Sequence, residues 1–187
     1  MSVHYKPEGF RQNTKYGLKW GDEYSTPPKT FRFFHEWMID CGHRGFNRDP
    51  CSSKANHKTP VFCTKRDNRL RCDAGESINF MNPPFSKKCG GTGAWTGWAV
   101  DVCRRGATVG ALLPVWGFGD AWAVDHVEPY ASEILFVEGR IKFIAPPGRP
   151  GLPDLGATFS TAFVLWLPGL RPIGTDIRTS WIKCPLR

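Results

Sequence analysis

Residues 77–85, Ser77-Ile78-Asn79-Phe80-Met81-Asn82-Pro83-Pro84-Phe85, decide how the chain is interpreted. The apolar run before the asparagine is typical of a short strand. Two prolines follow, and proline has no amide to give to the hydrogen-bond ladder of a sheet, so the chain must leave the sheet here. The sequence therefore predicts an asparagine side chain at the rim of a sheet, held by a rigid turn.

Such a turn is suited to methylation of an aromatic amine, whose lone pair is delocalised into its ring. The Asn82 side-chain oxygen and the Pro83 carbonyl can accept the two amine protons as hydrogen bonds and so localise the lone pair toward a methyl donor. Pro84 keeps the turn rigid, and Phe85 can stack on an extruded base. We therefore predict Asn82, Pro83, Pro84 and Phe85 as the catalytic residues. The alternative is a plain turn with Phe85 in the core.

The rest of the chain alternates predicted strands with predicted helices. Thr26, ahead of Pro27 and Pro28, can cap a helix that continues to about Asp40. The apolar residues Trp95, Trp98, Ala99, Val102 and Cys103 mark the clearest helix, after the glycines at 90–93. Another helix is expected at 120–127. Strands are expected at 45–50, 61–64, 77–81, 108–113 (ended by Pro114), 133–137, 140–143 and 161–167.

This pattern predicts a single-domain α/β fold. We expect a mainly parallel sheet with an antiparallel C-terminal edge and helices on both faces. The chain of 187 residues has room for one domain with a proper core. We divide it into an N-terminal arm at 1–20, a domain at 21–168 and a basic tail at 169–187.

The charge of the chain favours a polyanionic partner. Its 25 lysines and arginines exceed its 17 aspartates and glutamates, which leaves a net charge of +8. Arg140, Lys142 and Arg149 are candidates for phosphate or base contacts, and a solvated basic face is the alternative. No apolar run reaches transmembrane length and no signal peptide is recognisable, so a cytoplasmic protein is expected.

Seven cysteines are spaced irregularly, without a Cys-x-x-Cys pair. Cys41, His43, Cys51 and Cys63 could surround zinc, but we expect reduced thiols in a cytosolic protein and predict no metal site. The glycines at 90–93 lack the residues of a phosphate-binding loop. We interpret them as a hinge beside the active site.

The order of several short segments resembles the phage-type, Dam-like family of DNA adenine-N6 methyltransferases. The segments are Tyr24-Ser25-Thr26-Pro27-Pro28, Phe46-Asn47-Arg48-Asp49-Pro50-Cys51-Ser52, Asp67-Asn68-Arg69-Leu70 and Asn82-Pro83-Pro84-Phe85. The resemblance implies a Rossmann-like class I methyltransferase fold and S-adenosylmethionine as cofactor. It also implies that Thr26 and Pro27 line the methionine end of the cofactor, that Asp49 binds its amino or ribose groups, and that Asp67 approaches the adenosyl group.

The resemblance implies methyl transfer to the N6 amine of adenine in double-stranded DNA after base flipping, with high or low sequence specificity. We expect a monomer without a membrane partner, in the cytoplasm of the bacterial host if a phage encodes it. Alternatives are an amine methyltransferase acting on RNA, on cytosine N4 or on protein glutamine. A catalytically inactive nucleic-acid-binding scaffold also stays open, because Asn47-Arg48-Asp49-Pro50 stands where larger methyltransferases carry a Phe-x-Gly-x-Gly loop.

Overall fold

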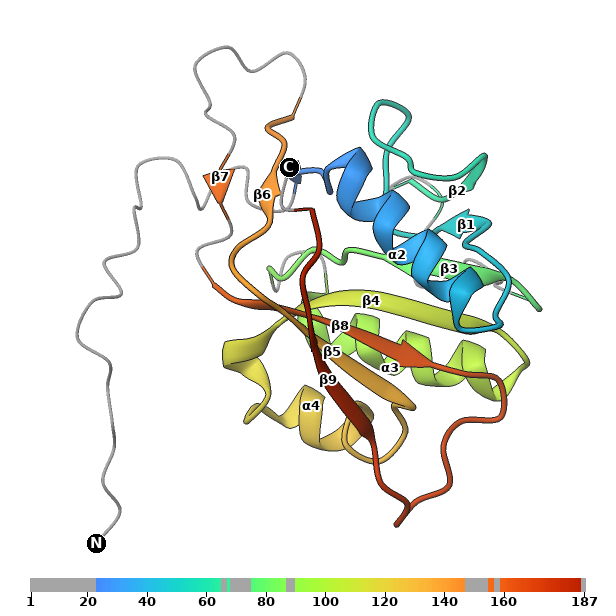
Figure 1. The fold of residues 1–187 in the computed structure, drawn as a ribbon. Helices are drawn as coiled ribbons and strands as arrows, with labels where there is room; N and C mark the ends of the chain where they lie inside the picture. Colours follow the sequence, from blue (N-terminus) through green and yellow to red (C-terminus); the bar gives the residue numbers. More distant parts are fainter. Residues whose placement is uncertain are drawn as a thin grey trace, which may run out of the picture.

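One mixed sheet dominates the protein (Figure 1). The computed structural model describes residues 23–64, 67, 75–86, 90–146, 155–156 and 159–185. In chain order its elements are α2 (Pro28–Asp40), β1 (Arg48–Asp49), β2 (Val61–Phe62), β3 (Ile78–Met81), α3 (Gly91–Arg104), β4 (Thr108–Pro114), the 3-10 turn η5 (Val115–Gly117), α4 (Ala121–His126), β5 (Glu133–Val137), β6 (Lys142–Phe143), β7 (Leu155–Gly156), β8 (Thr161–Trp166) and β9 (Arg178–Ile182). The predicted arm at 1–20 lies outside the described residues.

The sheet has seven strands in the order β2-β1-β3-β4-β8-β5-β9. β2, β1, β3 and β4 are parallel, and β8 is antiparallel to both of its neighbours, β4 and β5. This arrangement confirms the α/β class and a mainly parallel sheet. The predicted place of the reversed strand was wrong, because β8 lies inside the sheet. The edge is β9, from the segment expected to be a tail, and it runs parallel to β5.

The two faces of the sheet are covered by different helices, as predicted (Figure 1). Alternate residues of a strand point to opposite faces. In β8, Val164 and Trp166 pack in the cluster that contains α3 and α4, whereas Phe163 and Leu165 pack in the cluster that contains Phe34 of α2. Every residue of β4 and β8 is buried, which explains why both strands are uniformly apolar.

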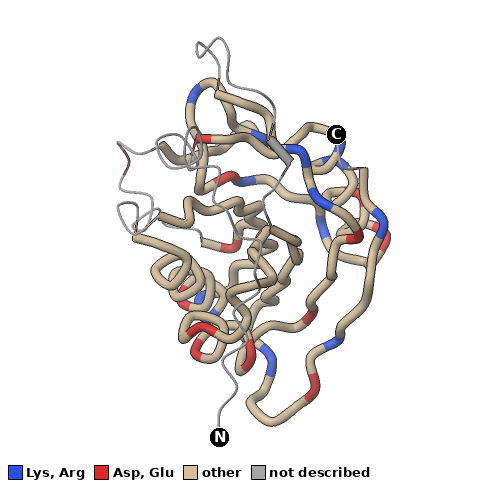
Figure 2. The backbone as a smooth tube through the Cα atoms, turned by 90° about the vertical axis from the view of Figure 1, so that its left-hand side faces the viewer, with Lys and Arg blue, Asp and Glu red and all other residues tan. Residues whose placement is uncertain are grey.

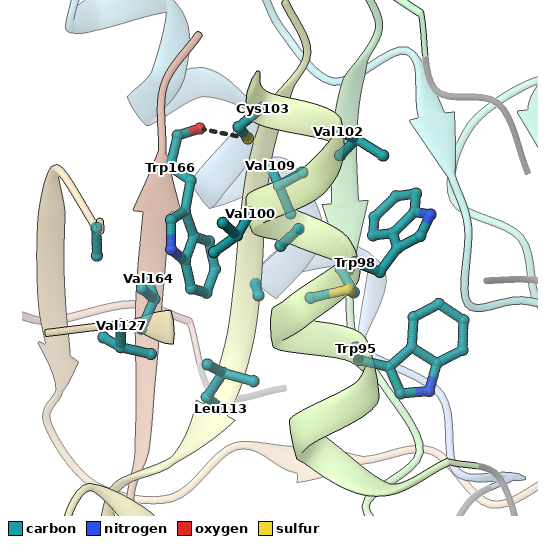
Figure 3. Close-up of a cluster of buried hydrophobic side chains, with 14 of the residues drawn as sticks. Trp95, Trp98, Val100, Val102, Cys103, Val109, Leu113, Val127, Val164 and Trp166 are labelled. Carbon is teal, nitrogen blue, oxygen red and sulfur yellow. Dashed lines mark hydrogen bonds between the residues drawn. The ribbon is translucent and has the colours of Figure 1, made fainter. Parts of the chain in front are cut away.

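Helix α3 buries its predicted apolar stripe against the sheet. Trp95 and Trp98 are at most 5% exposed, and Cys103 lies on the strand side of the helix, where its thiol contacts the carbonyl of Trp166 (Figure 3). The Trp166 indole donates to the carbonyl of His126, 2.9 Å away, at the end of α4. These contacts attach α3 and α4 to β8, and so to the face of the sheet that the two helices cover. Among the described residues, no helix has the length and apolar character needed to cross a membrane.

Two local predictions need correction. Thr26 does not cap α2; Pro27 is at the N-cap position without a side-chain cap, and Thr26 is buried instead. By contrast, β4 ends at Pro114 as predicted, and this last residue of the strand pairs with Thr161. The strand expected at 140–143 is shortened to β6 and pairs with β7 in a separate two-stranded sheet.

Candidate active site at the rim of the sheet

Two strand ends bring Asp49 and Asn82 to the same rim. β1 and β3 are parallel neighbours, with Arg48 opposite Asn79. Asp49 is the last residue of β1, and Asn82 follows directly on β3. Because ligands of such sheets bind beyond the carboxyl ends of parallel strands, this rim is the expected place for a site.

A pocket opens at that rim and contains both side chains. It holds about 320 Å³ of space, counting the solvent at its mouth. Its lining is mostly polar and comes from the segment before α2, from the loop after β1 and from the end of β3. The lining residues are Tyr24, Ser25, Thr26, Asp49, Cys51, Asn56, Lys58, Phe80 and Asn82.

Asp49 is a buried carboxylate at the base of this site, with 4% of its surface exposed. Its Oδ1 accepts a hydrogen bond from the amide of Cys51 at 3.2 Å, and its Oδ2 accepts one from the amide of Lys58 at 3.0 Å. Burial raises the pKa of Asp49 to about 6, and these two amides together with the charges of Lys58 and His57 oppose the rise. A buried acid of this kind is a natural partner for a positive ligand group.

Lys58 supplies a positive charge to the same pocket, and the sequence analysis missed it. Its Nζ donates to the hydroxyl of Ser25 at 3.0 Å and to the side-chain oxygen of Asn56 at 3.2 Å. Burial lowers the pKa of Lys58, and the nearby Asp49 carboxylate raises it. Lys58 is a single lysine in an irregular loop, so no sequence pattern distinguished it from the other lysines of the chain.

Of the other three predicted cofactor residues, one lines the pocket and two do not. Thr26 lines the pocket, whereas Pro27 is buried beside it and outside the lining. Ser25 exchanges two backbone hydrogen bonds of 2.9 Å with Ile144, the residue after β6. These bonds fix the position of the segment before α2. Asp67 is exposed and closes a small turn, accepting hydrogen bonds from the amide and hydroxyl of Thr64. It is outside the pocket lining, and its cofactor role stays a prediction.

The predicted catalytic turn leaves β3 at the mouth of the pocket. Asn82 is half-buried and lines the pocket, Pro83 and Pro84 are buried, and Phe85 is half-buried. The amide of Gly91, the first residue of α3, donates to the carbonyl of Ser86 at 2.9 Å. The turn is thereby anchored at both ends, to the sheet through β3 and to the helix layer through α3.

Two of the three residues expected to contact nucleic acid lie in the described part of the chain, and their role stays a prediction. Arg140 is exposed, Lys142 is half-buried on β6, and Arg149 lies outside the described residues. The described residues contain 13 of the 25 lysines and arginines and 13 of the 17 aspartates and glutamates, so they are neutral together. Figure 2 shows the two signs of charge spread around the fold. The whole excess of positive charge therefore belongs to the segments outside the described residues.

The cysteines give a further correction. Cys63, expected to be a reduced thiol, is disulfide-bonded, whereas Cys41, Cys51, Cys103 and Cys184 form no disulfide. The alternative zinc cluster is not formed, because the described part of the chain brings no three metal-ligating side chains of the Cys, His, Asp and Glu type together. Spacing along the chain says nothing about which cysteine side chains meet, so the disulfide was not predictable from it.

The comparisons with known proteins add to this geometry. The family model described as "DNA N-6-adenine-methyltransferase (Dam)" matches residues 13–161, which include the pocket and the turn after β3. A comparison with curated proteins gave no match. The family match covers well over half of the chain, and it agrees with the resemblance found in the sequence. The chain therefore belongs to the Dam family of DNA N-6-adenine methyltransferases.

Proposed function

We propose that this protein transfers a methyl group from S-adenosylmethionine to the N6 amine of adenine in double-stranded DNA. Family membership implies DNA adenine methylation. The observation that carries the residue assignment is that Asp49 and Asn82, from two parallel strands, line one pocket at the carboxyl rim of the sheet.

The side chains of the pocket fit the methionine end of the proposed cofactor, which carries an ammonium and a carboxylate. Asp49 offers a negative charge and Lys58 a positive one. The ion pairs found among the described residues do not include one between these two side chains. Asp49 would therefore bind the ammonium and Lys58 the carboxylate. When bound, the cofactor supplies an electrophilic methyl group. Thr26 and Phe80 are also part of the pocket lining.

The turn after β3 would hold the acceptor amine. The Asn82 side-chain oxygen and the Pro83 carbonyl each accept one amine proton as a hydrogen bond, which localises the nitrogen lone pair. The buried prolines keep both oxygens in position, and the half-buried ring of Phe85 is available for stacking on the base. In a duplex this amine is engaged in base pairing, so the adenine would have to be flipped out of the stack.

The proposed methyl transfer and its acceptor are tested by incubating purified protein and candidate substrates with S-adenosylmethionine that carries a labelled methyl group. We expect label in DNA, and no comparable label in RNA or in a protein extract, which are the substrates of the alternative enzymes. Asn82→Ala should lower the rate by on the order of 100-fold or more, because it removes one of the two acceptors. Asn82→Asp keeps an acceptor oxygen of similar reach and should retain part of the activity.

The assay separates failure of the fold from failure of the mechanism. Thermal unfolding of Asn82→Ala should match that of the parent protein, because Asn82 is at the pocket mouth and not in the core. Undiminished methyl transfer by this variant would overturn the role of Asn82. An absence of heat on titration of the parent protein with S-adenosylmethionine would instead support the inactive scaffold.

A further inference from the structure

Trp116 is an exposed indole at the same rim as the candidate active site. It belongs to η5, which directly follows β4, and β4 is the parallel neighbour of β3. The carboxyl ends of these two strands therefore put Trp116 and Asn82 on the same edge of the sheet. Trp116 is 61% exposed, whereas Trp95, Trp98 and Trp166 are at most 5% exposed. Trp116 is therefore not a residue of the core.

A row of three aromatic rings connects Trp116 to the turn after β3. The ring of Phe159 lies 5.5 Å from that of Phe85, at an interplanar angle of 75°. The Trp116 indole lies 6.4 Å from the Phe159 ring, also at 75°. We call Phe85, Phe159 and Trp116 the aromatic row. Its edge-to-face contacts favour a fixed orientation of each ring.

The backbone holds this row in place. The amide of Val115 donates to the carbonyl of Ser160 at 2.9 Å, which joins η5 to the segment that carries Phe159. Pro114 pairs with Thr161 in the adjoining ladder. Hydrogen bonds thus hold the backbone on both sides of the junction between β4 and Trp116. The pairing of β3 with β4 and of β4 with β8 sets the position of Trp116 relative to Phe85.

The chemistry of the row favours a nucleobase as its occupant. Phe85 begins the row at the turn that would hold the target adenine, and Trp116 ends it one ring further out, toward solvent. When an adenine leaves the stack, a neighbouring base loses its stacking partner and exposes an aromatic face. Aromatic side chains stack on bases with little regard to sequence, because every base has a π-face.

We propose that Trp116 is a binding residue for the DNA substrate, and that its indole stacks on a base next to the flipped adenine. This inference rests on the proposed function, since it needs DNA in the site. Phe159 would set the spacing between this base and the one that contacts Phe85. Trp116 would thus contribute to DNA affinity while leaving the cofactor pocket unchanged, because it is not part of the pocket lining.

The test is DNA binding by variants of two exposed tryptophans. The probe is a fluorescein-labelled duplex in which the parent protein has been shown to methylate a mapped adenine. Trp116→Ala should weaken binding by about 5- to 150-fold, the range for loss of one base–aromatic stack. Trp116→Phe should recover part of the loss. Trp181→Ala is the matched control, because Trp181 is 70% exposed on β9, three strand positions from β4, and should bind as the parent does.

Duplexes lacking single bases identify the contact. One base is removed at each position beside or opposite the mapped adenine. If Trp116 stacks on one of these bases, removing it should weaken binding by the parent protein but not by Trp116→Ala, so that the two losses are not additive. Losses that add at every position would overturn the proposal.

The remaining outcomes separate the inference from the proposed function. If the parent protein methylates DNA and Trp116→Ala binds the duplex equally well, the inference fails and the function stands. If the parent protein does not methylate DNA, the proposed function itself fails. If Trp116→Ala changes only the oligomeric state in sedimentation, the indole contacts a second copy of the chain, and the inference is again overturned.

Discussion

The buried carboxyl of Asp49 makes the free energy of unfolding depend on pH. Its carboxyl has a pKa of about 6 in the folded protein, against 3.8 for an ordinary aspartate, because burial disfavours the charged form. Between these two pH values the folded protein binds a proton that the unfolded chain has released. The folded state is therefore favoured at low pH, and this stabilisation is lost as the pH rises from about 4 to about 6.

We expect this dependence to disappear in Asp49→Asn. In the parent protein Asp49 should lower the free energy of unfolding by on the order of 3 kcal/mol across that pH range, and the variant should lack this decrease. Urea unfolding at several pH values between 4 and 7 measures the difference. Identical pH profiles for the two proteins would show that the Asp49 carboxyl titrates normally.

Lys58 should be required for the carboxylate of the cofactor and not for its adenosyl group. Replacing Lys58 by methionine removes the charge and keeps the apolar stem. Calorimetry should show a loss of about 10- to 100-fold in affinity for S-adenosylhomocysteine, the range expected when a hydrogen bond between charged groups is removed. Binding of 5′-methylthioadenosine, which lacks the amino-acid end, should change little. An equal loss for both ligands would mean that Lys58 only supports the loop after β1.

At the scale of elements, the turn after β3 depends on how α3 begins. Gly90 and Gly91 have φ angles of 91° and 68°, in the left-handed region that residues with a Cβ avoid. Gly91 also supplies the amide that holds the Ser86 carbonyl. Gly90 and Gly91, two of the glycines that we interpreted as a hinge, thus hold a specific backbone conformation next to the predicted catalytic turn, and the hinge stays a prediction.

Gly91→Ala should lower the free energy of unfolding by about 1–2 kcal/mol, the cost of a left-handed conformation for alanine. It should also lower the rate of methyl transfer, because relief of this strain would shift the segment that follows Phe85. Gly119→Ala is the control, since Gly119 has no positive φ and a Cβ there would meet no atom within 4 Å. Chemical unfolding and single-turnover assays measure the two effects. Equal stability of the two variants would contradict this role for Gly91.

At the scale of the whole molecule, the excess positive charge lies in other segments of the chain than the described fold. The described residues carry equal numbers of acidic and basic side chains, so the net charge of +8 comes from the other segments. Lys87 and Lys88, for example, directly follow the segment Phe85-Ser86 in the sequence. Electrostatic attraction to DNA and binding in the pocket should therefore respond differently to salt.

We expect the affinity for duplex DNA to fall by on the order of 10-fold or more between about 50 and 200 mM salt, because phosphate contacts release counterions. The affinity for S-adenosylhomocysteine should change much less, because salt screens a buried carboxylate (Asp49) and a half-buried lysine (Lys58) less than it screens exposed charges. Fluorescence anisotropy and calorimetry over the same salt series compare the two. DNA binding that is insensitive to salt would argue against a role for the basic segments.

Local patterns in the sequence predicted the elements with strong signals. The proline and aromatic residues of α2, the apolar stripe of α3 and the apolar runs of β4, β5 and β8 predicted these elements to within a few residues. The order of short segments was enough for the family, which the family model confirms. The start of the strand expected at 140–143 was wrong, because pairing with β7 decides which of these residues belong to a strand.

The sequence by itself determined that a rigid Asn-Pro-Pro-Phe turn follows a buried strand, because proline chemistry acts within a few bonds. Tertiary structure alone decided what that turn faces. The parallel pairing of β1 with β3 brings Asp49 to Asn82, and the loop after β1 folds back to add Lys58. Trp116 lies beyond the neighbouring strand and contacts the turn through Phe159. Such neighbours are set by the packing of the whole sheet, since residues distant in sequence meet only when its strands pair.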